Sequence, residues 1–161
     1  MKRVYSFVGI VAVICFLSVV TNAQKKEERG TASSQSSTAE WQSAANPNAR
    51  TLSEFVRVGN ILYLSGKLGT DNTNKLAAGG IGPETKQTLE NIKAVLEKNG
   101  SSMDNVIKCT VMLADIKEWG AMNEVYVTFF KKERLPARSA FGTSGLVNNA
   151  RVEIECMAIV K

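Results

Sequence analysis

Two short apolar segments near the middle of the chain predict the start of a folded domain. Residues 53–58 and 61–64 are rich in β-prone side chains, and Gly59 and Asn60 separate them. Both turn residues tolerate positive φ angles, so the pattern predicts a β-hairpin with a tight turn.

Helical periodicity follows a loop at 69–82 that is rich in Gly, Asn and Thr. Pro83 suits the first turn of a helix, and Gly100 suits the position just past its end. The apolar residues between them recur at helical spacing, so one face of this helix should pack inward. They are Leu89, Ile92, Val95 and Leu96.

A strand and a second helix are predicted next. The strand, 106–113, alternates so that one face carries Ile107, Cys109, Val111 and Leu113. Asp115 predicts the cap of the helix, and Glu118 completes a capping box. The apolar stripe of this helix consists of Trp119, Met122, Tyr126, Phe129 and Phe130. Asn123 falls inside the stripe, where a buried amide needs a hydrogen-bond partner.

Two last strands are predicted over 138–145 and 151–160. In the second, Glu153 and Glu155 share one face with apolar residues, and the other face is wholly apolar. Such a mixed face suits a pocket wall or a subunit interface. The order β-β-α-β-α-β-β predicts an α+β domain with two helices on one face of a mixed sheet. The other sheet face needs a partner, so we expect an oligomer.

The first 23 residues have the pattern of a secretory signal. Lys2 and Arg3 precede an uncharged apolar run, which ends in small residues at Ala23. We therefore predict a signal peptide at 1–23 and an exported protein, periplasmic or secreted, without membrane contact after cleavage. The alternative is an uncleaved anchor, because the run is long enough to span most of a bilayer.

Residues 24–50 form a polar tract with almost no apolar side chain to bury, which predicts a flexible linker. Trp41 breaks this pattern, and the sequence leaves open whether its ring docks on the domain or stays exposed. The folded domain is then predicted over 51–161, a length that can bury a modest core.

Charge and composition exclude several classes of function. The formal net charge of +5 falls to +3 if Lys2 and Arg3 leave with the signal, because 18 basic residues then face 15 acidic ones. The sequence has no basic stripe interleaved with aromatic residues, so nucleic-acid binding is not indicated. It also has no His, which excludes Ser-His and Cys-His triads and argues against a zinc site.

Two cysteines lie in the predicted domain, Cys109 and Cys156, and both fall in apolar strands. A Cys in a strand usually behaves as a small hydrophobic residue, so we expect two buried free thiols. An exported protein could instead pair them.

Arg138 and Glu153 are the candidate chemical groups. Arg138 stands in Leu-Pro-Ala-Arg-Ser, and Glu153 follows fifteen residues later in an alternating strand pattern. A guanidinium grips a carboxylate through two parallel hydrogen bonds, and a carboxylate can orient or deprotonate a water. Together they suffice for a small active site. The spacing alone favours the alternative, a structural ion pair between neighbouring strands.

The domain from about residue 51 resembles the RidA/YjgF family of reactive-intermediate (enamine/imine) deaminases. The resemblance runs in order through Arg-Val-Gly-Asn-Ile-Leu-Tyr-Leu-Ser-Gly at 57–66, Thr-Leu-Glu-Asn-Ile-Lys at 88–93, Asn123 with its aromatic neighbours, Pro-Ala-Arg-Ser at 136–139 and Val-Glu-Ile-Glu at 152–155. It implies a chorismate-mutase-like fold and a homotrimer with clefts between subunits. It also implies hydrolysis of 2-imino or enamine acids, of the 2-aminoacrylate or 2-iminobutanoate type, to 2-keto acids and ammonia, without cofactor or metal.

The same resemblance implies roles for individual residues. Arg138 matches the Arg that binds the substrate carboxylate, and Glu153 matches the Glu that positions the attacking water. Asn123 matches an active-site Asn, which would explain a polar residue in an apolar stripe. Ser65 and Gly66 match the turn that lines the cleft. Ala140 matches a position whose backbone contacts the substrate.

Two positions depart from the family pattern. Leu52 stands where many deaminating members have a Tyr that caps the cleft, and Val147 stands where many have a Pro. The alternative function is therefore a non-catalytic module of the same fold that binds a small carboxylate, such as a keto acid. Ribonuclease activity, attached to some relatives of this family, has no support in the charge pattern and ranks last.

Overall fold

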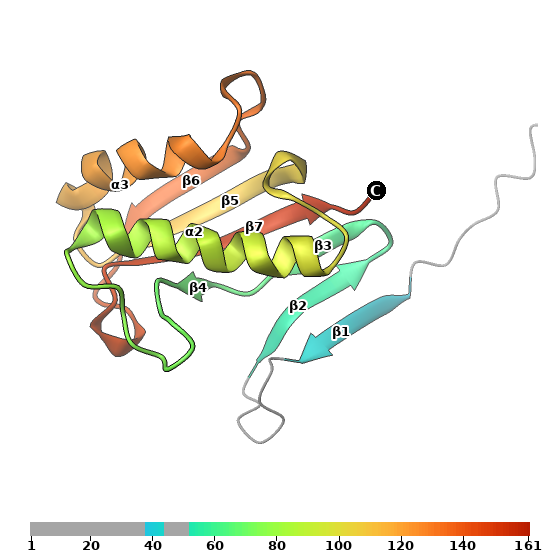
Figure 1. Ribbon diagram of the computed structural model, residues 1–161, viewed down its shortest axis with the longest axis horizontal. Helices are drawn as coiled ribbons and strands as arrows, with labels where there is room; N and C mark the ends of the chain where they lie inside the picture. The colour runs from blue at the N-terminus through green and yellow to red at the C-terminus, as the bar shows by residue number, and fades with distance from the viewer. Residues whose placement is uncertain (1–37, 44–51) are drawn as a thin grey trace, which may run out of the picture. The chain divides into compact units, whose positions relative to one another are not determined.

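A mixed β-sheet organises the residues that the computed structural model describes, 38–43 and 52–161 (Figure 1). The strands follow the order β1-β2-β3-β7-β5-β6, and β4 pairs with β7 beside this path. β5 and β6 run parallel, and the other paired strands are antiparallel. The strands are β1 (Ala39–Ser43), β2 (Ser53–Val58), β3 (Ile61–Leu64), β4 (Lys67–Leu68), β5 (Val106–Leu113), β6 (Ala137–Gly142) and β7 (Val152–Ile159).

Two helices, α2 (Ile81–Lys98) and α3 (Trp119–Tyr126), cover one face of this sheet (Figure 1). The predicted α+β class, with two helices on one face of a mixed sheet, is confirmed. Short 3-10 turns complete the connections: η1 (Met103–Asn105), η2 (Ile116–Glu118), η3 (Val127–Phe129), η4 (Lys132–Arg134) and η5 (Val147–Asn149).

The predicted hairpin is confirmed in position and register. β2 and β3 have the expected bounds, and Val58 pairs with Ile61 across the turn. Gly59 has a φ of 59°, a value that favours Gly because it has no Cβ.

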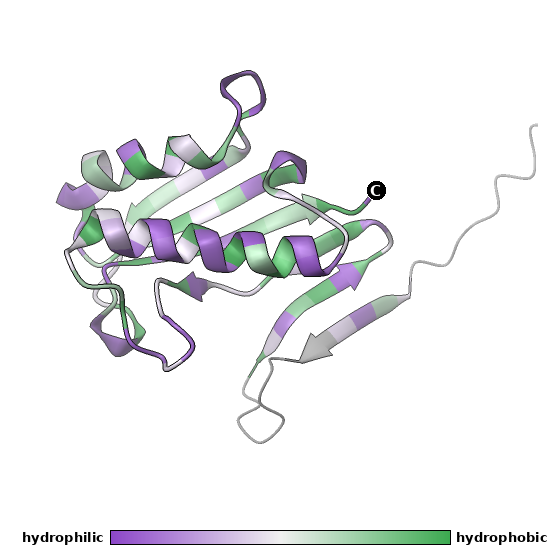
Figure 2. Cartoon of the chain, viewed as in Figure 1, coloured by the Kyte–Doolittle hydropathy of each residue, from purple (hydrophilic) through white to green (hydrophobic). Residues whose placement is uncertain are grey.

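Helix α2 begins two residues before the predicted start, at Ile81, and ends at Lys98. Gly100 follows with a φ of 75°, and Ser101 N–H donates to the Leu96 carbonyl at 2.9 Å, which closes the last turn. The four predicted apolar residues are all buried against the sheet. Figure 2 shows hydrophilic (purple) and hydrophobic (green) residues recurring in turn along α2, as expected of a helix with one buried face.

Strand β5 departs from simple alternation at its start. Its pairing with β7 shifts register between Val106 and Lys108, a β-bulge. As a result Val106 is buried, whereas Ile107 is 40% exposed. The prediction that Ile107 faces the core is therefore wrong, although Cys109, Val111 and Leu113 do face it.

The predicted cap of the second helix is only half correct. The Asp115 carboxylate accepts a hydrogen bond from Lys117 N–H at 2.9 Å, but it caps η2 and not α3. The Glu118 side chain forms an ion pair with Arg151 instead of closing a capping box. In the predicted stripe Met122, Tyr126 and Phe130 are buried, while Trp119 is 42% exposed.

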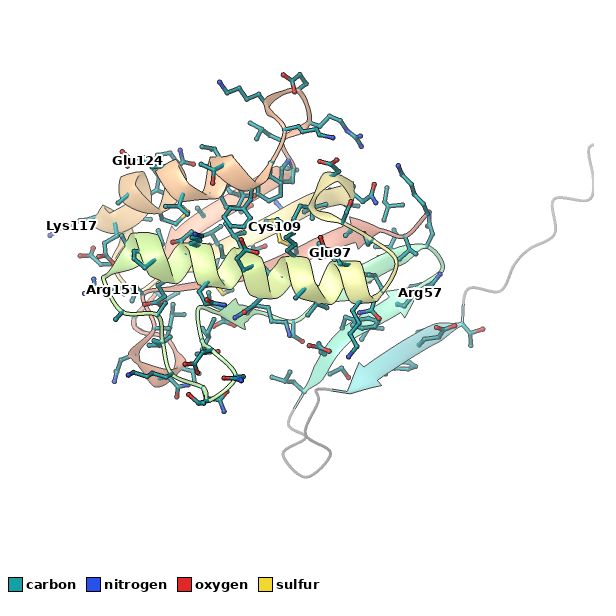
Figure 3. All side chains as sticks on the ribbon, viewed as in Figure 1. Arg57, Glu97, Cys109, Lys117, Glu124 and Arg151 are labelled. Atoms are coloured by element: carbon teal, nitrogen blue, oxygen red, sulfur yellow. A yellow bond between two sulfur atoms is a disulfide. The ribbon has the colours of Figure 1, made fainter. Side chains whose placement is uncertain are left out.

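The helix-facing side of β7 is buried as predicted, and it meets β5 at a disulfide. Cys109 and Cys156 stand directly opposite each other in the antiparallel register and form a disulfide bond in the core. Figure 3 labels Cys109 near the middle of the drawn domain. The expectation of two free thiols is therefore wrong, because it took no account of the register between the two strands.

Strand β1 lies within residues 24–50, for which the sequence predicts a flexible linker. It pairs with the outer edge of β2, and the side chain of Trp41 is 69% exposed. The rest of that segment and the predicted signal peptide, 1–23, lie outside the described residues. Among the described residues, no helix is long and apolar enough to cross a membrane.

Candidate functional site

Arg138 and Glu153 lie on opposite faces of the sheet. Arg138 is the register partner of Cys109 in the parallel pair β5–β6, so its side chain shares the helix-covered face with that core residue. Glu153 stands three residues before Cys156 on β7, and side chains alternate along a strand. Glu153 therefore points away from the helices.

Strand β5 also separates these two residues within the sheet. The path from Arg138 to Glu153 crosses two strand spacings, from β6 to β5 and from β5 to β7, and then runs three residues along β7. Their Cα atoms are therefore about 14 Å apart. Among the described residues, neither side chain takes part in an ion pair within the chain. A structural ion pair between neighbouring strands, the alternative that spacing favours, is therefore wrong.

The Arg138 guanidinium lies against two aromatic rings of helix α3. Its Cζ atom is 4.4 Å from the centroid of the Tyr126 ring and 5.7 Å from that of the Trp119 ring. Its Nη1 atom is buried and has no hydrogen-bond partner among the described residues. A guanidinium with a buried, unpaired Nη1 atom is suited to receive an acceptor from outside the chain, such as a carboxylate.

Asn123 lies on the same stripe of α3, four residues after Trp119 and three before Tyr126. Its Oδ1 atom and the Tyr126 hydroxyl are also buried without a partner among the described residues. Burial raises the pKa of Tyr126 to about 12, although the nearby Arg138 charge opposes this shift. Two unpaired polar groups on one helix face, beside an unpaired guanidinium, indicate a place for a polar ligand.

Ala140 follows two residues after Arg138 and lies on the same face of β6, packed against the core. β6 ends the described strand order, where it pairs with β5 alone. Its outer backbone groups are therefore placed to contact a ligand or another chain. Arg138, Asn123 and Ala140, with the two aromatic rings, make up what we call the Arg138 half-site.

Glu153 lies against the turn that joins β3 to β4. Gly66 is so close to its carboxyl group that a Cβ atom at this position would stand 2.8 Å from Glu153 Cδ, and nearer still to Oε1. The adjacent Ser65 is fixed by its hydroxyl, which donates to the Ser53 carbonyl at 2.6 Å, and by its N–H, which donates to the Glu54 carbonyl at 3.1 Å. We call Glu153, Ser65 and Gly66 the Glu153 half-site.

A buried carboxylate holds the start of β7 in place. Glu84, near the start of α2, is 3% exposed, and its Oε1 accepts hydrogen bonds from the N–H groups of Arg151 at 2.6 Å and Val152 at 3.3 Å. These bonds tie the residues immediately before Glu153 to the helix layer. The position of Glu153 thus depends on packing as well as on strand pairing.

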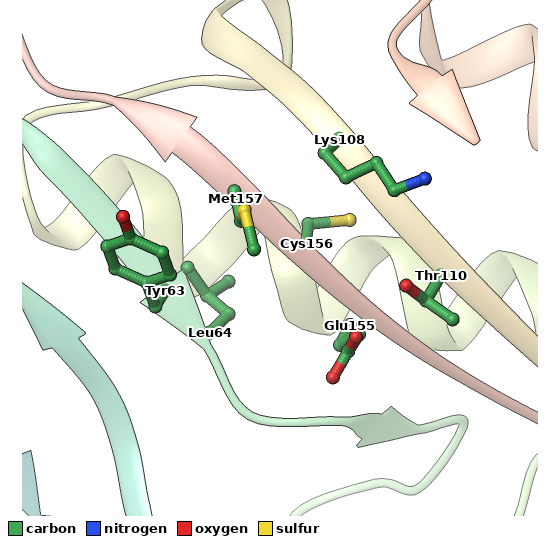
Figure 4. A pocket seen from close by; sticks show the side chains of 7 residues that line it. All are labelled: Tyr63, Leu64, Lys108, Thr110, Glu155, Cys156 and Met157. Carbon is green, nitrogen blue, oxygen red and sulfur yellow. The ribbon is translucent and has the colours of Figure 1, made fainter. Parts of the chain in front are cut away.

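Two hollows lie near the Glu153 half-site. One, of about 150 Å³, opens on the uncovered face of the sheet between Lys108, Glu155 and Met157, and none of the six predicted site residues lines it (Figure 4). The other, of about 790 Å³, lies between α2 and the loop after β4 and includes Gly66 in its wall. Within the described residues, no three His, Cys, Asp or Glu side chains gather in a group that could hold a metal ion.

The structure therefore brings the six predicted residues together as two groups and not as one site. Sequence reasoning missed the contribution of Trp119 and Tyr126, because aromatic residues at helical spacing usually form core. The signal that could have found them is Asn123, a polar residue in the same stripe. The two positions that depart from the family pattern, Leu52 and Val147, are 57% and 68% exposed.

Comparison with known proteins identifies relatives of this fold. Residues 42–160 match the family described as Endoribonuclease L-PSP. The 2-iminobutanoate/2-iminopropanoate deaminase of Mus musculus is 41% identical over 108 residues, which cover 66% of this chain and 79% of that protein. The RutC family protein UK114 of Drosophila melanogaster is 44% identical over 117 residues, 72% of this chain and 83% of that protein.

A solved structure agrees with these sequence matches. The crystal structure of RidA from the Antarctic bacterium Psychrobacter sp. PAMC 21119 has a TM-score of 0.66 and 35% sequence identity, and the match covers 78% of this chain and 99% of that one. The resemblance seen in the motifs is confirmed by matches that span most of the chain. This chain belongs to the Endoribonuclease L-PSP family, that of the RidA/YjgF proteins.

Proposed function

We propose that this protein hydrolyses 2-imino acids, or the enamines from which they form, to 2-keto acids and ammonia. The names of relatives about 40% identical to the chain support an imine deaminase activity. The observation that carries the proposal for this chain is the buried, unpaired Nη1 atom of Arg138, which lies against the face of α3 that also holds the unpaired Oδ1 atom of Asn123.

The reaction needs few catalytic groups. The carbon of a protonated imine is already electrophilic, so water adds to the C=N bond without a covalent nucleophile, and ammonia then leaves to give the keto acid. Arg138 would hold the substrate carboxylate and thereby fix the reacting carbon. Glu153 would orient the water and accept its proton. Asn123 and the Ala140 backbone would hold the rest of the substrate.

A complete site needs two copies of the chain. Within one protomer Arg138 and Glu153 lie on opposite faces of the sheet, so one substrate cannot use both. In a homotrimer, the Arg138 half-site of one subunit would meet the Glu153 half-site of its neighbour in the cleft between them. The apolar side chains on the uncovered sheet face, among them Tyr63, Phe141 and Met157, support such an assembly.

The alternative is a binding module that holds a small carboxylate without turnover. Leu52 favours it, because the side chain in this exposed position carries no hydroxyl to cap the cleft. Arg138 would have the same role in both functions, and Glu153 would matter only for deamination.

One assay separates these functions. An amino-acid oxidase generates 2-iminobutanoate, and semicarbazide traps the imine that has not yet been hydrolysed. We expect the protein to reduce the trapped imine, and Arg138→Ala and Glu153→Gln to abolish that effect. Binding of 2-oxobutanoate without any effect on the imine would favour the binding module, and no effect of either substitution would contradict the proposed site.

We also propose that the protein works outside the cytoplasm. The signal pattern at 1–23 motivates this, and the disulfide between Cys109 and Cys156 fits an oxidising compartment. Fractionation of cells that express the full chain, with the N-terminus of the protein sequenced, tests both export and cleavage after Ala23. Recovery from the cytoplasm with residues 1–23 intact would contradict it.

A further inference from the structure

The guanidinium of Arg138 has aromatic neighbours but no polar partner in the described part of the chain. Its Cζ atom lies 4.4 Å from the Tyr126 centroid and 5.7 Å from the Trp119 centroid, both within the range of a cation–π contact. The side chain of Arg138 forms no ion pair or hydrogen bond with any described residue. Among the described residues, the guanidinium is therefore contacted by aromatic rings and not by a polar group.

Ring contact has a specific consequence for a guanidinium. An aromatic ring engages the cation through the ring face, whereas a carboxylate engages the N–H groups along the guanidinium edge. A carboxylate partner from the chain would occupy the same N–H groups that a substrate needs. Two rings therefore restrain the side chain and leave its donors free.

We propose that Trp119 and Tyr126 form an aromatic clamp that positions the Arg138 guanidinium for a substrate carboxylate. This inference rests on the proposed role of Arg138 in binding a carboxylate. Tyr126 is the fixed wall of the clamp, since it is 2% exposed and its ring packs 4.8 Å from that of Phe130. Trp119 is the outer wall, which is 42% exposed at the rim of the half-site.

The ring of Tyr126, and not its hydroxyl, carries this function. The hydroxyl is buried without a partner among the described residues, so its removal costs no hydrogen bond within the chain. Tyr126→Phe keeps the ring over Arg138 and should keep ligand affinity. Tyr126→Leu removes the ring and leaves the guanidinium free to move, so it should lower the affinity for the carboxylate ligand.

The experiment uses the full-length protein and two readouts, the Kd for 2-oxobutanoate by calorimetry and the kinetics of 2-iminobutanoate loss. We expect Tyr126→Leu to raise the Kd and KM about tenfold, and Trp119→Leu about threefold, with kcat changed less. Tyr126→Phe should restore values close to those of the original protein. Phe130→Leu is the matched control, because it removes the other ring of the same buried pair without touching Arg138.

The outcomes separate this inference from the proposed function. If Phe130→Leu lowers the thermal midpoint as much as Tyr126→Leu but leaves the Kd unchanged, the clamp is supported and a merely structural role is excluded.

Turnover by the original protein with an unchanged Kd and KM in Tyr126→Leu would overturn the clamp alone. Binding without turnover that still depends on Tyr126 would support the clamp and overturn deamination. If Tyr126→Leu does not fold, an unchanged Kd in Trp119→Leu overturns the clamp, and no binding to the original protein overturns both ideas.

Discussion

Gly66 lies against the carboxyl group of Glu153, although 86 residues of sequence separate them. A Cβ atom on Gly66 would stand 2.8 Å from Glu153 Cδ and would overlap Oε1. The contact exists because Lys67 and Leu68 of β4 pair with Ile154 and Glu153 of β7. Gly66 thus keeps open the space that the carboxylate occupies.

The first prediction concerns this space. Gly66→Ala should force the Glu153 carboxylate from its position, and we expect deamination to fall about 100-fold, because misplacement by about 1 Å is enough for such a loss. Glu153 is only partly buried, so its side chain can move and the fold should persist. Steady-state kinetics with 2-iminobutanoate, together with a circular dichroism spectrum, test both parts.

Gly82→Ala is the control for that experiment. Gly82 lies in α2, where a Cβ atom would make only an ordinary contact of 3.8 Å with Val125. This variant should keep full activity. Full activity in Gly66→Ala would mean that the present position of Glu153 is not the one used in the reaction.

Local features of this fold could be predicted from the sequence, and distant pairings could not. The β2–β3 hairpin depends on two neighbouring turn residues, and α2 depends on one periodic stretch with its end signals. The bulge that exposes Ile107 and the register that joins Cys109 to Cys156 both depend on how β5 meets β7. Those strands are distant in sequence, and a pattern within one strand does not contain the alignment between two.

The arrangement of the candidate site also depends on strand pairings that the sequence does not contain. The resemblance could nominate Arg138 and Glu153, but nothing in the spacing of β6 and β7 places them on opposite faces. That fact follows from the register of both strands with β5, where Cys109 pairs with Arg138 on one side and with Cys156 on the other. Nor could the stripe of α3 distinguish Tyr126, which contacts Arg138, from Phe130, which contacts the core. Both are aromatic residues on the buried side of the chain.

A second prediction follows from the opposite placement of Arg138 and Glu153. If each site joins the half-sites of two subunits, Arg138→Ala and Glu153→Gln should complement each other in mixed oligomers. When equal amounts of the two variants are refolded together, about a quarter of the sites should combine a native Arg138 with a native Glu153. We expect the mixture to regain about that share of the original activity, while each variant alone stays inactive.

The control for complementation is a mixture of Arg138→Ala with a double variant that carries both substitutions. No interface in that mixture can supply both native residues, so it should stay inactive. Failure of the first mixture to regain activity, despite mixed oligomers detected by native mass spectrometry, would contradict a shared site.

The third prediction concerns the disulfide between Cys109 and Cys156, which closes a loop with a sequence separation of 47 residues. Loop closure of this length should stabilise the fold by about 4 kcal/mol through the unfolded state. The double variant Cys109→Ala with Cys156→Ala should therefore unfold at lower urea concentration than the oxidised protein. The comparison is made with and without a reductant.

The reductant supplies the internal check on that prediction. It should lower the stability of the original protein but leave the double variant unchanged. If the original protein has two titratable thiols after purification without reductant, or if the reductant has no effect on its unfolding, then the bond does not stabilise the fold as expected.

The last prediction links the Tyr126 hydroxyl to stability at high pH. Burial raises the pKa of Tyr126 in the folded protein to about 12, whereas an unfolded Tyr titrates near its usual value of 10.0. The folded state therefore holds this proton more tightly, and its contribution to stability is fully present below pH 10. That contribution should be lost between about pH 10 and pH 12, by up to about 2 kcal/mol.

Lysines titrate in the same range, so the quantity to measure is the difference in unfolding free energy between the original protein and Tyr126→Phe at each pH. We expect Tyr126→Phe to gain stability relative to the original protein as the pH rises through this window, and a difference that stays constant with pH would show that the phenol is not held in its neutral form by burial.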